Sequence, residues 1–277
     1  MTTRRDFLGA VGAATLGSHH LFSRLSPPAS RLGSLGVQLY TVRGLMQSDF
    51  EGTLGRVAEI GYRQVEFAGY FNHDPRAVKG ILDRLHLTAP SSHIPIESLE
   101  TGWERMLEDA HTMGHRYLVV AWTPVERRRT LDDWRRIGEL FTRAGRTARA
   151  AGIQFAYHNH DYEFVPLEGR LPFDALLDAS DPDAVKIEMD LYWIRKGGQD
   201  PLEYFRRWPG RFPMVHVKDM SADGRMVDVG AGAIDWHAIF ARREQAGIRH
   251  YFVEHDEPAD PIGSIRASYG YLSRLRV

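Results

Sequence analysis

The sequence contains no cysteine, which excludes disulfides, thiolate metal ligands and cysteine nucleophiles while leaving the cellular compartment open. It also lacks any apolar run near the roughly 20 residues that a membrane-spanning helix needs, so no stable membrane anchor is predicted. The formal net charge is -1, and residues 1–30 carry +2 of it (Arg4, Arg5 and Arg24 against Asp6), which leaves -3 for the rest. A mildly acidic chain argues against sequence-independent binding of nucleic acid.

The chain begins with the features of a bacterial export signal. Arg4 and Arg5 form a twin arginine ahead of Phe7 and Leu8, and a short run rich in Gly and Ala follows. This pattern is typical of a twin-arginine (Tat) signal peptide and predicts a periplasmic or secreted protein. The alternative is a disordered basic N-terminus without a targeting role. We therefore assign residues 1–33 to the signal and its linker, and residues 34–277 to the mature domain.

Strand-like and helix-like stretches alternate through the mature domain. Strand-like runs begin near Leu35, Tyr62, Leu87, Arg116, Ile153, Ala184, Phe212 and His250. The amphipathic segments predicted to be helices are Asp49–Ile60, Asp74–Leu85, Leu99–Met113, Leu131–Ala151, Pro172–Ala179, Pro201–Trp208, Trp236–Ala246 and Pro261–Leu275. Eight such units in about 250 residues favour an α/β fold, a single closed (β/α)8 TIM barrel, over an open doubly wound sheet. The first strand carries no GxGxxG turn, which weakens a dinucleotide-binding interpretation further.

Polar residues gather where these strands end. The stretch Tyr157–Phe164 (YHNHDYEF) places two imidazoles, an amide and two carboxylates at the end of the fifth strand-like run. Buried polar groups need partners, so such density favours chemistry over a purely structural role. A TIM barrel brings the C-terminal ends of its strands to one mouth, where catalysis takes place. We expect six side chains to converge there: Glu66, His93, His158, Asp190, His216 and Glu254.

A set of short motifs resembles the xylose isomerase-like TIM barrel superfamily of sugar phosphate isomerases and epimerases. In chain order they are VEF, SSH, YHNHDYEF, IEMD, HVKD, GAGAIDW and FVEHDEP, from about Leu35 to the C-terminus. The superfamily includes ketose 3-epimerases, inosose dehydratase-like proteins and endonuclease IV. The resemblance implies a TIM barrel that holds one divalent cation through side chains of strands five to eight.

The matching metal ligands are His158, Asp190, His216 and Glu254. In the epimerases the first ligand is usually a glutamate, and here the sequence AYH puts His158 in its place. Two imidazoles and two carboxylates suit Mn²⁺, Fe²⁺, Co²⁺, Ni²⁺ or Zn²⁺ better than Mg²⁺, and we expect Mn²⁺. His158 could instead lie behind the ligands, and the other three could form a structural ion-pair network.

This substitution also bears on catalysis. The family's epimerases are thought to use two metal-bound glutamates, one to remove a carbon-bound proton and one to return it to the opposite face. Here Glu254 can remain the base, while Glu163, His160 or Lys218 has to supply the acid. The asymmetric pair suits isomerisation or β-elimination at least as well as epimerisation. In the alternative, His160 and Glu163 only order their loop, and Lys218 pairs structurally with Asp219 or Glu188.

Other residues are candidates for holding a sugar. Glu66 and His93 match family positions near the substrate. Trp193 and Trp122 offer apolar faces for a sugar ring, although core packing would also explain these two tryptophans. The backbone amides of the Gly230–Ile234 loop could cradle a phosphate. That loop contains no Lys or Arg, so an unphosphorylated sugar fits better.

These features predict a metal-dependent isomerase, epimerase or related lyase. It would act on a keto-sugar or a 3-keto-glycoside through an enediolate, formed by proton abstraction next to a carbonyl polarised by the metal. The alternatives are a metal-free sugar-binding or accessory protein, an endonuclease IV-like phosphodiesterase, and a glycosidase with two carboxylates. We expect a small-molecule sugar or glycoside as partner and no nucleic acid, and the resemblance allows a homo-oligomer.

Overall fold

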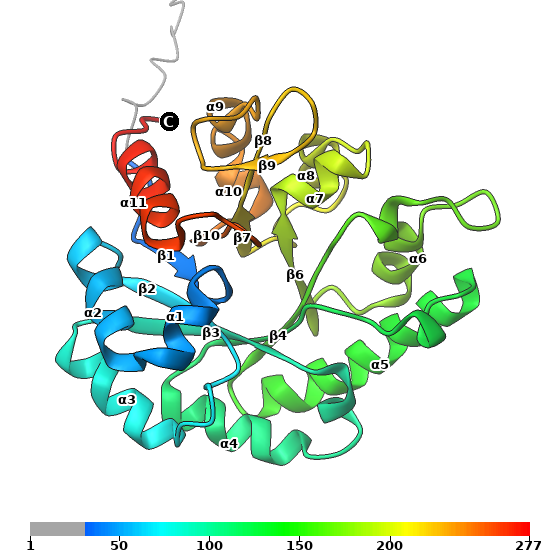
Figure 1. The fold of residues 1–277 in the computed structure, drawn as a ribbon. Helices are drawn as coiled ribbons and strands as arrows, with labels where there is room; N and C mark the ends of the chain where they lie inside the picture. The colour runs from blue at the N-terminus through cyan, green and yellow to red at the C-terminus, as the bar shows by residue number, and fades with distance from the viewer. Residues whose placement is uncertain (1–30) are drawn as a thin grey trace, which may run out of the picture.

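The computed structural model describes residues 31–277 as a closed barrel of parallel strands ringed by helices (Figure 1). The strands close in the order β1-β10-β7-β6-β5-β4-β3-β2, so the predicted TIM barrel is confirmed. Their bounds are β1 (Leu35–Gln38), β2 (Gln64–Ala68), β3 (Thr88–Ile94), β4 (Tyr117–Val120), β5 (Gln154–His158), β6 (Val185–Asp190), β7 (Met214–Val217) and β10 (His250–Val253). Each begins within two residues of the start of one of the predicted strand-like runs.

The helices begin at residues that stabilise a helix N-terminus. Asp49 and Asp74 accept hydrogen bonds from the first turns of α2 and α3, and Thr130 forms a capping box with Asp133 at the start of α5. The helices are α1 (Arg43–Ser48), α2 (Phe50–Ile60), α3 (Pro75–Arg84), α4 (Trp103–Met113), α5 (Leu131–Ala150), α6 (Pro172–Ala179), α7 (Leu191–Lys196), α8 (Pro201–Arg207), α9 (Trp236–Phe240), α10 (Arg243–Ala246) and α11 (Pro261–Leu272).

Some predicted boundaries were wrong. The helix predicted from Leu99 begins at Trp103, because Ile96–Leu99 forms a short 3-10 turn and Gly102 adopts a left-handed conformation. The helix predicted over Trp236–Ala246 is divided into α9 and α10. Helices α1 and α7 and the hairpin of β8 (Asp219–Met220) and β9 (Met226–Val227) were not predicted, since each is too short to show a hydrophobic period.

The barrel interior is divided into an apolar floor and a polar layer above it. Val119, Ala156, Met214 and Phe252 form a small buried cluster of their own. Ala156, Met214 and Phe252 each stand two residues before a predicted ligand, and side chains two apart in a strand share a face. Gly36 is required beside this floor, because a Cβ there would lie 2.5 Å from the Phe252 ring. The floor therefore shields the polar layer from below.

No helix within residues 31–277 is long and apolar enough to cross a membrane. The twin arginine and the rest of the predicted export signal up to residue 30 lie outside the described residues. The boundary at residue 34 and the export route stay predictions.

Candidate functional site

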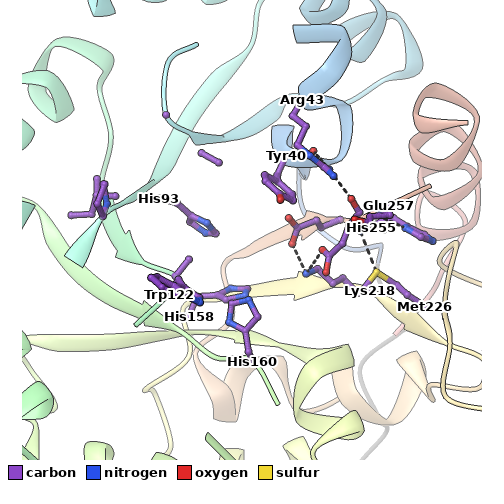
Figure 2. A pocket seen from close by; sticks show the side chains of 17 residues that line it. Tyr40, Arg43, His93, Trp122, His158, His160, Lys218, Met226, His255 and Glu257 are labelled. Atoms are coloured by element: carbon purple, nitrogen blue, oxygen red, sulfur yellow. Dashed lines mark hydrogen bonds and ion pairs between the residues drawn. The ribbon is translucent and has the colours of Figure 1, made fainter. Parts of the chain in front are cut away.

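The six predicted side chains lie together at the C-terminal end of the barrel. A cavity of about 810 Å³ opens above them, and His93, His158, Lys218 and Glu254 are among the residues that line it (Figure 2). The buried Glu66, Asp190 and His216 lie beneath its surface. Parallel strands of one closed barrel deliver these residues to a common point although up to 188 positions separate them in the sequence (254 - 66).

The four predicted metal ligands face one another. His158 Nε2 is 3.6 Å from Asp190 Oδ2, which is 4.0 Å from His216 Nδ1, and His216 Nδ1 is 2.7 Å from Glu254 Oε2. Four ligands placed about 2.1 Å from one ion in a tetrahedron lie about 3.4 Å apart. Asp190 Oδ2 is buried and has no neighbour in hydrogen-bonding geometry among the described residues. Asp190, His216 and Glu254 offer ligand atoms within 4.8 Å of one another and could hold a divalent cation, whereas His158 falls in a second such group with His93, Glu188 and His216.

A second group of side chains lies deeper and holds the two imidazoles. Glu188 Oε2 is 3.2 Å from His158 Nδ1 and 3.2 Å from His216 Nε2, and His93 Nε2 lies 2.7 Å from the same oxygen. Glu66 Oε2 is 2.6 Å from His216 Nε2. A metal-binding histidine typically donates its other ring N–H to a carboxylate, which fixes its tautomer and orientation. Glu188 thus leaves His158 Nε2 available to a cation, whereas His216 Nδ1 is hydrogen-bonded to Glu254 Oε2 and would have to lose its proton to bind one.

Sequence reasoning assigned no site role to Glu188. The signal was present, because Glu188 precedes Asp190 by two residues and shares its face of β6. Its register partners are His158 on β5 and Met214 on β7, and Met214 belongs to the apolar floor. A fully buried glutamate in such a layer needs positive partners, which the histidines provide.

The cluster carries more carboxylates than cations. Glu66, Glu188, Asp190 and Glu254 are paired with Lys218 and with the imidazoles of His93 and His216. Although burial opposes it, Glu188 and Glu254 raise the pKa of His216 well above its ordinary value, so a cation bound there would displace the His216 proton. Burial raises the pKa of Asp190 to about 6 in spite of the nearby Lys218. Burial alone would lower the pKa of His93, but Glu66 and Glu188 raise it to about 9, so this ring is protonated at neutral pH.

Lys218 lies between the carboxylates at the rim of the cluster. Its Nζ is 3.0 Å from Asp190 Oδ2, 2.7 Å from Glu254 Oε2 and 2.8 Å from Asp256 Oδ1 (Figure 2 marks contacts of this ammonium with dashed lines). The predicted structural pairing with Asp219 or Glu188 was wrong. Although burial opposes it, these three carboxylates hold the pKa of Lys218 well above its ordinary value. The ammonium is therefore a fixed positive charge on the cavity wall.

Asp219 instead organises the Gly230–Ile234 loop. Its carboxylate accepts hydrogen bonds from the backbone N–H of Gly230 (2.8 Å), Gly232 (3.2 Å) and Ile234 (3.3 Å), and from Trp236 Nε1 (3.1 Å). The two remaining amides of the loop donate to backbone carbonyls. The hypothesis of a phosphate cradle was wrong, because these amides are already used.

The loop after β5 carries two of the proposed proton donors, Glu163 and His160, in different surroundings. Glu163 is buried and accepts hydrogen bonds from the Tyr157 hydroxyl and from the His160 backbone N–H (3.0 Å), and it does not line the cavity. Burial raises the pKa of its carboxyl to about 7. His160 does line the cavity, and burial lowers the pKa of its imidazole to about 3, so the ring is neutral.

The two predicted tryptophans lie in different surroundings. Trp122 lines the cavity and is 55 % exposed. Trp193 does not line it, and its ring packs 5.6 Å from that of His160, with Lys218 Nζ 5.7 Å from its centre. Trp193 thus supports the loop and the ammonium, and only Trp122 is open to a ligand.

The family model described as "Xylose isomerase-like TIM barrel" matches residues 54–274. The chain belongs to this family. The resemblance inferred from the seven motifs is therefore confirmed, and the predicted kinship with sugar-acting enzymes is supported by the relatives below.

Three relatives are informative. An inosose dehydratase of Lacticaseibacillus casei is 28 % identical over 191 residues, and the match covers 62 % of this chain and 63 % of the relative, less than two thirds of its length. A sugar phosphate isomerase/epimerase structure from Parabacteroides distasonis ATCC 8503 is 26 % identical with a TM-score of 0.77, over 86 % of this chain and 93 % of that one. The IOLI protein with a bound zinc atom is 16 % identical with a TM-score of 0.70, over 86 % and 96 %, which shows the shared fold.

Proposed function

We propose that this protein is a divalent-metal-dependent isomerase, epimerase or related lyase. It acts on a keto-sugar or a 3-keto-glycoside by removing a proton next to a carbonyl. The observation that carries the proposal is the convergence of His158, Asp190, His216 and Glu254 beside the cavity, with Lys218 in ion pairs with Asp190 and Glu254. The bound cation would be Mn²⁺, or another ion that accepts imidazole and carboxylate, and it would polarise the carbonyl.

Different residues of the chain would serve the separate proton-transfer steps. Although burial opposes it, Lys218 and His216 hold the pKa of Glu254 well below its ordinary value, so Glu254 is ionised, and it is the candidate base for the carbon-bound proton. Lys218 offers a positive charge and N–H donors to the substrate oxygen on which negative charge develops. His160 is neutral at the same cavity and can exchange a proton with a hydroxyl. Glu163 positions His160 through its backbone rather than acting on the substrate.

The relatives support a reaction of this class without deciding its outcome. One is named for a dehydratase and another for an isomerase/epimerase, and both names describe changes at sugar-like carbon atoms. His158 breaks the symmetry of a two-glutamate shuttle, so elimination and isomerisation are favoured at least as much as epimerisation. Export through the twin-arginine route, predicted from Arg4 and Arg5, would bring the enzyme to free or oxidised sugars and glycosides.

Deuterium exchange tests the proposal. The chelator-treated protein is reloaded with Mn²⁺ and incubated with keto-sugars and 3-keto-glucosides in D₂O, and proton NMR follows the C–H next to the carbonyl. We expect exchange or conversion that needs the metal and is lost in Asp190→Asn. The exposed Glu97→Gln serves as the matched control. Absence of exchange and turnover across the panel with metal-loaded protein would refute the function.

One observation favours a second candidate, a metal-free sugar-binding or accessory protein. Lys218 Nζ lies within 3.0 Å of carboxylate oxygens of both Asp190 and Glu254, so an ammonium already offsets part of the charge that a cation would neutralise. Elemental analysis of the purified protein, with a Mn²⁺ and Zn²⁺ titration, separates the two. A protein that neither retains nor binds these ions belongs to the second class.

A further inference from the structure

The cavity has two walls of opposite character. The ends of β5, β7 and β10 supply the polar wall, with His158, His160, Lys218, Glu254 and Asp256. The ends of β1 to β4, which are neighbours in the barrel, supply a wall that is apolar apart from His93, Arg43 and the Tyr40 hydroxyl. Its apolar members are Tyr40, Ala68, Gly69, Ile94, Pro95, Ala121 and Trp122.

Two aromatic rings stand open on this apolar wall. Tyr40 is 42 % exposed and Trp122 is 55 % exposed, and they are two of the four large hydrophobic residues exposed within residues 31–277. They follow β1 and β4, the outer strands of this group of four. Ala68, Gly69 and Ala121, which are small, line the same wall together with Ile94 and Pro95. An apolar surface that is left open inside a cavity indicates a ligand that covers it.

The Tyr40 ring is held in place before any ligand arrives. The Arg43 guanidinium lies 4.0 Å from the ring centre, and its Nη1 donates to the carbonyl oxygens of Tyr40 (2.9 Å) and Asp256 (2.6 Å). Gln38 accepts from the Tyr40 backbone N–H (3.1 Å) and donates to Glu66 (2.9 Å). The backbone of Tyr40 is thereby linked to both the polar wall and Glu66, and Arg43 covers its ring. Such preorganisation lowers the entropy cost of binding.

We infer that the substrate is a glycoside with an aromatic aglycone, whose sugar lies on the polar wall and whose aglycone lies on the Tyr40–Trp122 wall. The inference rests on the proposed function and narrows its substrate class. The cavity, about 810 Å³, is near the upper end of the roughly 300–1,000 Å³ that holds drug-sized ligands, so a lone sugar ring leaves much of it unfilled. A second sugar would turn hydroxyls toward Ala68, Ile94 and Ala121, where they lose hydrogen bonds to water without replacement.

The test uses methyl and phenyl 3-keto-β-glucosides, which differ only in the aglycone. Calorimetric titration of the full-length, Mn²⁺-loaded protein gives the dissociation constant of each. We expect the phenyl compound to bind about tenfold more tightly, as one good aromatic contact provides. Trp122→Ala should abolish this advantage and Trp122→Phe should keep most of it. Val165→Ala, exposed and outside the cavity, should leave it unchanged.

Several results would overturn the inference. These are equal affinities for the two compounds, no binding of either, or an unchanged ratio in Trp122→Ala with a wild-type melting temperature. Tighter binding of 3-keto-cellobiose than of the phenyl compound would assign the wall to a second sugar. Deuterium exchange separates this test from the proposed function. A phenyl preference without metal-dependent exchange refutes the function alone, whereas exchange with equal affinities refutes the aromatic subsite alone.

Discussion

Glu188→Gln is expected to weaken metal binding although Glu188 is not a proposed ligand. Its Oε2 is the common partner of His93 Nε2 (2.7 Å), His158 Nδ1 (3.2 Å) and His216 Nε2 (3.2 Å). The amide removes the negative charge that orients both ligand imidazoles. Loss of such an outer carboxylate costs about 10- to 100-fold in metal affinity, which corresponds to about 1.4–2.7 kcal/mol.

Competition with a chromophoric chelator at fixed pH measures this effect. Glu66→Gln should lose less affinity, because Glu66 Oε2 lies closest to a single ligand, His216. Glu163→Gln is the matched buried control, since Glu163 bonds to Tyr157 and to the His160 backbone rather than to a proposed ligand. An unchanged affinity in Glu188→Gln, with the melting temperature preserved, would refute the claim that Glu188 orients the ligands. A similar loss in Glu163→Gln would trace the effect to general loosening instead.

Three further predictions concern charge, pH and the loop after β7. Lys218→Met should raise metal affinity by about tenfold in the same assay, because the change removes a positive charge beside two proposed ligands. The same change should abolish turnover. Weaker metal binding would contradict the idea that the ammonium and the cation compete. His115 is buried and burial lowers its pKa to about 4, below its ordinary 6.5. Its contribution is therefore complete above pH 6.5, and up to about 3 kcal/mol is lost as pH falls toward 4. Chemical denaturation should show this slope and His115→Gln should flatten it; equal slopes would refute the assignment. Asp219→Ala should lower stability by about 2–4 kcal/mol and speed hydrogen exchange of the Gly230 and Gly232 amides, and unchanged exchange of these amides would show that another group orders the loop.

The position of Asp190 could be predicted from the sequence, whereas that of Glu163 could not. Asp190 ends a strand, and its alternation with Met189 placed it inside the barrel, where it faces His158, His216 and Lys218. Glu163 follows His158 by five residues in the sequence, yet the 3-10 turn Tyr162–Phe164 directs its carboxylate to Tyr157. The conformation of a short loop depends on what it packs against, and hydrophobic periodicity carries no signal for it.

Alternation of apolar and polar residues, together with Asp, Thr and Pro at helix starts, determined the eight strand–helix units and therefore the barrel. It also determined that His158, Asp190, His216 and Glu254 end at one mouth, because parallel strands align their C-terminal ends. Only the closed barrel decided which side chains share a level inside it. The register of β6 against β7 sets Asp190 beside His216, and Glu188 beside Met214 of the floor. Such neighbours are set by the stagger of strands around the whole ring, a quantity that no single strand encodes.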